Sequence, residues 1–262
     1  MRRIVVIVTA LAALVGAVSA YAATSGFNTY NAKINFAPNK AGSNRAPAAV
    51  AFTEHYVASG TNGNRTAPLT NIKTTIYGLK VNAKGFPTCS ASKIANAKSD
   101  SSCPKKALIA TGSITATLGP LQNTSVSNPD TLKCDPLLHA WNGGGGKVVF
   151  FFLDAPGHTC GPLQTGAVPP FVGTVKTVGK NLVQNTPIPA YVSFPEGLEG
   201  SLTSETLHFL KLTHKVHGKI VAYTTSVACK KGKRPYSVTF TAESAPGGTV
   251  QSGTASGTQK CK

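Results

Sequence analysis

Six cysteines carry the most definite chemistry in this chain of 262 residues. An even number of cysteines favours disulfide bonds when a protein works in an oxidising compartment, although six cysteines allow many connectivities. Their order along the chain suggests three successive loops. This order predicts the pairs Cys89 with Cys103, Cys134 with Cys160, and Cys229 with Cys261.

A metal site or a catalytic site is the competing interpretation of the middle cysteine pair. Zinc accepts two thiols and two imidazoles as ligands, and Cys134, His139, His158 and Cys160 form such a set. Their spacing along the chain, however, is not that of a zinc finger. A secreted hydrolase or metal-dependent enzyme could instead use Asp154 and His158, which follow an apolar run in a loop. Because cysteines of exported proteins are more often bonded than nucleophilic, we expect no metal, no cofactor and no catalytic residue.

The other acidic residues offer no recognisable catalytic pair. Glycoside hydrolases need two carboxyl groups at a defined separation. Here the acids are scattered, and no spacing marks a pair among Asp135, Asp154, Glu196, Glu199, Glu205 and Glu243.

The balance of charge predicts an affinity for polyanions. There are 26 Lys and Arg residues against 9 Asp and Glu, a net charge of +17. The densest basic segment is Lys230, Lys231, Lys233 and Arg234, with Lys215 and Lys219 in the turn before it. If both turns share one rim, they could bind an anionic wall polymer, a polysaccharide or lipid headgroups. A general contribution to solubility near an anionic wall is the simpler alternative.

Residues 1–22 have the three parts of a secretory signal peptide. Arg2 and Arg3 form a positive start, residues 4–18 are apolar and uncharged, and small residues allow cleavage after Ala20 or, as we prefer, after Ala22. Residues 4–18 are fewer than the roughly 20 needed to span a bilayer. We therefore expect a secreted protein of residues 23–262 with no membrane span after cleavage and a net charge of +15, from 24 basic and 9 acidic residues.

The mature chain predicts an all-β fold, an antiparallel β-sandwich. Short runs of alternating apolar and polar residues, rich in β-branched types and bounded by Gly, Pro and Asn, predict strands. They cover 29–36, 48–58, 69–77, 107–118, 147–153, 171–178, 190–194, 206–212, 219–228, 236–242 and 249–257. The run 147–153 does not alternate, so we expect that strand to be covered on both faces. The glycines before it predict a turn.

One short helix and one linker complete the expected organisation. Residues 90–98 read as a helix between the first two cysteines, with Ser90 as its N-cap. The proline-rich stretch 181–195 is the best linker or crossover candidate. We expect a single β-sandwich domain over 23–262, with a division into two halves near residue 185 as the alternative.

Several short motifs are shared with a known group of proteins. They are residues 86–90 (FPTCS), 102–105 (SCPK), 141–143 (WNG) and 235–241 (PYSVTFT), together with Cys229 and Cys261. By these motifs the chain resembles an uncharacterised family of exported actinobacterial β-proteins. The resemblance implies a disulfide-containing β-sandwich, with the first cysteine pair bonded across a short helix and the last pair holding the C-terminus. It implies no activity.

Together these features predict a secreted, non-enzymatic β-sandwich protein of the cell envelope or its surroundings. Its expected role is to bind an anionic polymer or to serve a structural purpose. The alternative is a secreted hydrolase or metal-dependent enzyme that uses the loop of Asp154 and His158.

Overall fold

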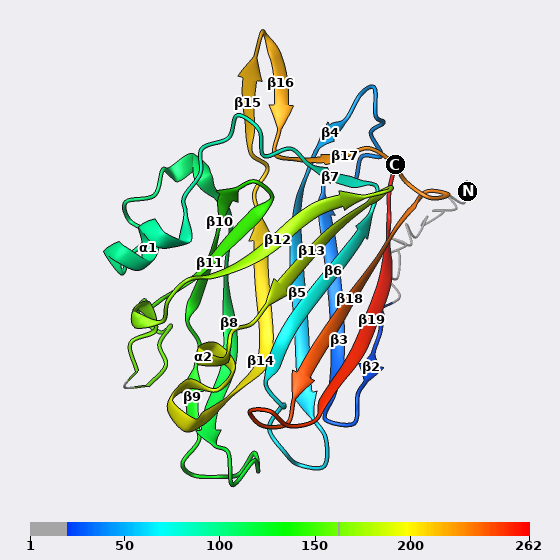
Figure 1. Cartoon of the computed structure of the whole chain (residues 1–262). Coiled ribbons are helices and arrows are strands. Elements are labelled where there is room, and N and C mark those ends of the chain that lie inside the picture. Colours follow the sequence, from blue (N-terminus) through cyan, green and yellow to red (C-terminus); the bar gives the residue numbers. More distant parts are fainter. Residues whose placement is uncertain (1–19, 162) are drawn as a thin grey trace, which may run out of the picture.

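The computed structural model describes residues 20–161 and 163–262, so residues 1–19 of the expected signal peptide lie outside the described part. Strands dominate it (Figure 1), which confirms the all-β class. In chain order the first strands are β1 (Ala20–Tyr21), β2 (Ala23–Thr24), β3 (Asn28–Ala37), β4 (Ala48–Ala49), β5 (Ala51–Gly60), β6 (Leu69–Tyr77), β7 (Leu79–Val81), β8 (Leu108–Pro120), β9 (Leu132–Cys134) and β10 (Leu137–Gly144). The later strands are β11 (Lys147–Leu153), β12 (Phe171–Val178), β13 (Asn181–Pro187), β14 (Leu198–Phe209), β15 (Thr213–Val216), β16 (Lys219–Ala222), β17 (Thr224–Ser226), β18 (Lys233–Glu243) and β19 (Val250–Lys260). The helices are α1 (Ala91–Ala97) and α2 (Ala190–Ser193), with 3-10 turns η1 (Lys105–Ala107), η2 (Thr165–Ala167) and η3 (Pro195–Gly197).

One antiparallel sheet of 14 strands forms most of the described molecule. Its order is β1-β19-β18-β6-β13-β12-β11-β10-β8-β14-β5-β3-β2, with β9 paired to β8. The backbone N–H of Phe36 in β3 donates to Gln259 Oε1 in β19 at 2.8 Å, and the Tyr236 hydroxyl in β18 donates to the Ala32 carbonyl in β3 at 3.4 Å. These bonds join opposite ends of the strand order, so the sheet is nearly closed.

The core fills the space that this curved sheet encloses. Alternate residues of each strand point inward, as in β3, where Tyr30, Ala32 and Ile34 are fully buried. Stacked aromatic rings join strands across the interior, for example Tyr30 on Phe240 with ring centroids 4.6 Å apart. Inward alternation along many strands is therefore what builds the core.

Strand β11 is covered on both faces, as its apolar run predicted. Val148 and Phe150 point into the main core, whereas Val149 and Phe151 pack outside against a second cluster around Ile94 of α1. A strand buried on both sides has no polar phase, which explains the missing alternation.

The helix over β11 forms where the sequence predicted it. Ser90 caps α1 by accepting a hydrogen bond from the Lys93 backbone N–H at 3.2 Å. The Cys89–Cys103 disulfide closes this segment. Asp100 ties it to β10 by accepting hydrogen bonds from His139 Nδ1 at 2.7 Å and Trp141 Nε1 at 3.2 Å.

All three expected disulfides are present. Besides Cys89–Cys103, the structure has the disulfides Cys134–Cys160 and Cys229–Cys261, which leaves no free cysteine among the described residues. The first of these two joins β9 to the loop after β11, and the other holds the end of β19 near the start of β18. Three disulfides indicate an oxidising setting, extracellular or periplasmic. Across the described ranges no helix is long and apolar enough to cross a membrane.

Two expectations about the proline-rich stretch 181–195 need correction. Residues 181–187 are no linker but strand β13, which pairs with β6 and β12 in the middle of the sheet. The crossover begins only after Pro187, because the next strand, β14, is not a neighbour of β13 in the sheet. The expected strand 190–194 is instead helix α2. Pro187 and Pro189 lack the N–H donors that a continuing strand needs, and Ser193 Oγ anchors the new turn by donating to the Leu69 carbonyl at 2.6 Å.

The expected turn at the glycine run begins later, because β10 continues to Gly144.

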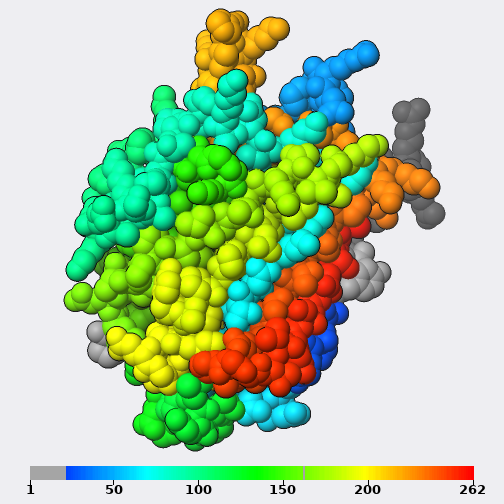
Figure 2. Space-filling view, viewed as in Figure 1, coloured from blue at the N-terminus to red at the C-terminus, as the bar shows by residue number. Residues whose placement is uncertain are grey.

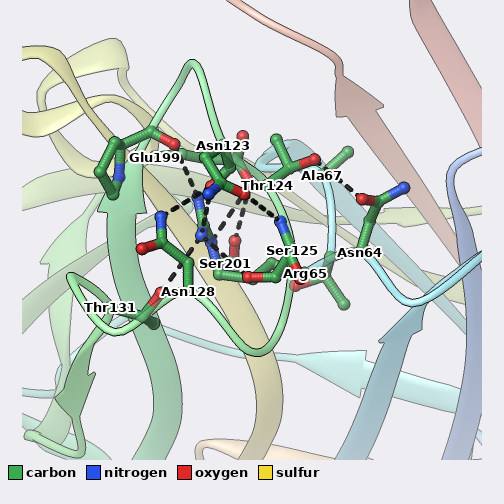
Figure 3. Close-up of polar contacts among 12 residues, drawn as sticks. Asn64, Arg65, Ala67, Asn123, Thr124, Ser125, Asn128, Thr131, Glu199 and Ser201 are labelled. Carbon is green, nitrogen blue, oxygen red and sulfur yellow. Dashed lines mark hydrogen bonds and ion pairs between the residues drawn. The ribbon is translucent and has the colours of Figure 1, made fainter.

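A buried arginine organises the outer side of β8 and β14 (Figure 3). Arg65 lies 3.8 Å from Glu199 through its Nε and donates through Nη1 and Nη2 to the carbonyls of Asn123 and Pro120, each at 2.9 Å. Its guanidinium covers Gly119, where an added Cβ would lie 2.6 Å from Arg65 Cζ. One cation thus holds the loop after β8 against β14.

Candidate ligand-binding cavity

An apolar cavity of about 150 Å³ opens at the end of the sheet that carries α2. Its walls come from β6, β8, β11, β12 and β14, and the Cys134–Cys160 disulfide forms part of its lining. Leu163 and Tyr191 are its exposed apolar lining residues, at 36% and 42% of their full exposure. They place the mouth between the loop after β11 and α2.

A close contact of backbones shapes this mouth. Gly200 of β14 lies under α2, and a Cβ at this position would stand 2.7 Å from the Val192 carbonyl oxygen. Asp154 shapes the other side, because its carboxylate accepts hydrogen bonds from the backbone N–H groups of Thr165 at 2.9 Å and Gly166 at 3.4 Å. The rim is therefore held by specific contacts rather than by loose loops.

A β-bulge in β14 turns a carboxyl group into the cavity. Leu202 and Glu205 both line it, although strict alternation would send residues three apart to opposite faces. The register with β8 shifts between Leu202 and Ser204, which inserts one extra residue and reverses the phase of the rest of the strand. Before the bulge Glu199 points to Arg65 on the outside, and after it Glu205 points inward.

The inner end of the cavity is rich in hydrogen-bond acceptors. A smaller space of about 30 Å³ adjoins it, and Glu205 lines both. This space also meets Glu54, Tyr56 and Gln184. Glu54 is 1% exposed, and its Oε2 has no hydrogen-bond partner, whereas the Tyr56 hydroxyl is 2.8 Å from Thr74 Oγ1.

The two inner carboxyl groups titrate far above the usual range of glutamate. Burial raises the pKa of Glu54 to about 8, and the nearby Glu205 raises it further. Burial raises the pKa of Glu205 to about 7. Both shifts arise because a carboxylate loses its hydration inside the protein.

This arrangement can hold a small molecule with an apolar body and a polar group. Among the described residues no Lys, Arg or His lines either space. Pockets of this type bind by burying the body and fixing its polar end. The sequence analysis missed this site, because the acidic residues are scattered along the chain and Glu54 was not among the candidates. The sequence did contain a sign of the site, because Glu54 lies between Phe52 and Tyr56 at a position of β5 where alternation predicts a buried apolar side chain.

The basic residues expected to bind polyanions lie elsewhere. Lys231 is exposed in the two-residue turn before β18, and Lys230 and Lys233, which flank this turn, are exposed too. Lys215 and Lys219 are exposed on the β15–β16 hairpin, and both turns lie toward the upper end of Figures 1 and 2, with the loop before β4 between them.

Arg234 does not belong to that surface. It is fully buried, with its guanidinium carbon 4.6 Å from the ring centre of Phe36 and its Nη2 donating to Ser226 Oγ and, at 3.3 Å, to the Lys40 carbonyl. Burial lowers the pKa of Arg234 to about 10. Arg234 is buried because it is the first residue of β18 whose side chain points inward.

The residues of the enzyme alternative are not assembled into a nucleophile and base. Cys160 is bonded to Cys134 and has no thiol. His158 Nδ1 is 3.1 Å from the Asp135 carbonyl, and the Asp154 carboxylate is bonded to the η2 turn. Within the described part of the chain no three His, Cys, Asp or Glu residues gather as a metal site.

Comparison with known proteins adds no further assignment. No family model, no curated protein and no solved structure matches the chain.

Proposed function

We propose that the protein is a secreted, non-enzymatic binding protein that holds a small, largely apolar molecule in the cavity beneath α2. The supporting observation is the cavity itself, which is apolar over most of its lining and ends in a few polar groups. Ordinary protein interiors contain few spaces larger than a water molecule. A site of about 150 Å³ is comparable with an engineered cavity of about that size that binds benzene.

Occupancy of the cavity is tested with toluene, benzyl alcohol and benzylamine. We expect at least one of them to raise the melting temperature, because a ligand that binds only the folded state stabilises it by RT ln(1 + [L]/Kd). Ala116→Phe should reduce the affinity by about tenfold or more, since Ala116 lines the cavity and a phenyl ring would fill it. Calorimetric titration of the purified mature protein measures this.

The matched control is Ala95→Phe, which adds the same ring at an exposed position of α1. It should leave all three affinities unchanged. Binding of none of the three probes contradicts the proposal. So does binding that Ala116→Phe leaves intact.

A second function is favoured by the exposed basic turns, and we propose that they bind an anionic polymer. The turn before β18, with Lys230, Lys231 and Lys233, lies at the same end of the fold as the β15–β16 hairpin, which carries Lys215 and Lys219 (Figure 1). The loop between them adds basic side chains that are also exposed, Lys40 and Arg45. Such a cluster binds polyanions through the release of counterions.

Long-chain polyphosphate is the probe for this surface. Replacing Lys230, Lys231 and Lys233 by Gln should make the negative slope of log K against log salt shallower by about 2, at roughly 0.7 for each lost contact. The triple variant for comparison removes the same charge from exposed positions in α1, directly after it and in η1, through Lys93→Gln, Lys98→Gln and Lys105→Gln. Equal effects of the two triple variants would show that net charge alone attracts the polymer and would refute a dedicated surface.

A further inference from the structure

We infer that the ligand of the cavity is a small amine, an ammonium group on a compact apolar body, and that Glu54 and Glu205 bind the ammonium group. This inference rests on the proposed function of the cavity and specifies the class of ligand. It goes further because it assigns a recognition role to the buried carboxyl group of Glu54 and the half-buried carboxyl group of Glu205.

The first argument is the position of the two carboxyl groups. In the pairing of β5 with β14, Glu54 stands opposite Leu207 and Glu205 stands opposite Tyr56. Glu54 and Glu205 are therefore diagonal neighbours on adjacent strands, a relation within reach of long side chains. Both line the smaller inner space, so they can approach one group placed there.

The second argument is the unused hydrogen-bonding capacity of Glu54. This residue is 1% exposed, and its Oε2 has no partner. Buried polar atoms without partners are rare because such an atom has lost its hydrogen bonds to water without replacement. A donor from a ligand would satisfy this oxygen.

The third argument is the absence of a positive partner from the described protein. Glu54 and Glu205 take part in no ion pair. The titratable groups that line the inner space are these two carboxyls and the Tyr56 phenol, and its other polar lining residues are Thr74, Gln184 and Thr186. Paired acids elsewhere in the fold have cations, as Glu199 has Arg65. A cationic ligand would supply the partner that Glu54 and Glu205 lack.

The chemistry of the site distinguishes among ligand classes. An ammonium group would donate charge-assisted hydrogen bonds to both carboxylates and would offset the cost of burying their charge. An alcohol can donate one neutral hydrogen bond, and a carboxylate ligand would meet like charges. The apolar walls, which include Phe152 and Phe171, suit a body about the size of a benzene ring.

The decisive experiment compares benzylamine with benzyl alcohol, which have the same body and different head groups. At pH 8 the wild-type protein should bind benzylamine about tenfold more tightly or better, because charge-assisted hydrogen bonds are roughly twice as strong as neutral ones. Glu205→Gln and Glu54→Gln should each reduce this preference below about threefold. Glu243→Gln, which removes an acid outside the cavity, should leave the preference unchanged.

The pH dependence gives a second readout that needs no variant. Binding of the ammonium favours ionised carboxyls, so benzylamine should bind more tightly as the pH rises from about 5.5 to about 8 and should release protons to the buffer. Titration in two buffers of different ionisation enthalpy measures that release. The affinity for benzyl alcohol should show no such rise.

The outcomes separate this inference from the proposed function. Binding of toluene or benzyl alcohol with no preference for benzylamine overturns the amine assignment and leaves the cavity as a binding site. A preference for benzylamine that both Gln variants retain also overturns the assignment. If none of the three probes binds, the proposed function fails as well.

Discussion

Replacing Arg65 with Met is expected to lower the free energy of unfolding by about 3–5 kcal/mol, the usual cost of removing one partner of a buried ion pair. Both side chains of the pair with Glu199 are 2% exposed. The change would leave the Glu199 carboxyl buried without its cation, and burial already raises the pKa of that group. The carbonyls of Asn123 and Pro120 would lose their donors too.

Urea unfolding followed by the fluorescence of Trp141 measures this loss. The charge explanation predicts that Glu199→Gln partly rescues the variant, so the double variant should be more stable than Arg65→Met alone. Arg65→Lys should recover only part of the loss, because one ammonium cannot reproduce the planar set of donors of a guanidinium. Strict additivity of the two changes would show that the ion pair is not what holds the loop after β8.

Raising the pH from about 5 to about 9 is expected to destabilise the protein through Glu54 and Glu205. The folded-state pKa values of these groups, about 8 and about 7, lie above the ordinary value of 4.5. Below pH 4.5 both groups are protonated in the folded and the unfolded states, and they cost nothing. Between pH 4.5 and about 8 the unfolded chain releases protons that the folded chain keeps, so stability falls until the folded carboxyls ionise too.

The expected loss is at least about 3 kcal/mol, because each pKa unit costs about 1.4 kcal/mol and the pKa rises of the two groups together exceed two units. Chemical unfolding at a series of pH values measures it. The double variant Glu54→Gln and Glu205→Gln should lack this component and should be more stable than the wild type at pH 9. Glu243→Gln should keep the wild-type slope. An identical slope in the wild type and the double variant would contradict the assignment of these groups.

Much of the architecture follows from local patterns in the sequence. The apolar run of β11 predicted a strand covered on both faces, and the structure covers it with the core on one side and α1 on the other. The Ser90 cap predicted α1 because a side-chain acceptor before a helix satisfies a free backbone N–H. The cysteine order predicted the three disulfides, since neighbouring cysteines close the shortest loops.

Other elements could not be predicted, because long-range contacts decided them. The prolines of 181–195 suggested a linker, yet β13 is held on both sides by β6 and β12. The aromatic and β-branched residues Tyr191, Val192 and Phe194 suggested a strand, but the docking of this segment on β6 and over Gly200 makes α2. Propensity is a weak guide where a segment has few residues and its partners are distant in the chain.

The sequence by itself determined an all-β protein, its short capped helix and its disulfide pairs, because period-two alternation, capping residues and cysteine order are local features. Only the tertiary structure decided where the charges lie. It buried Arg234, and through the bulge in β14 it turned Glu205 toward the small space that Glu54 also lines. Strand phase and register set the side of the sheet on which a side chain lies, and a single inserted residue reverses that side. The exposed basic turns were readable from composition, whereas the cavity exists only because strands distant in the sequence enclose it.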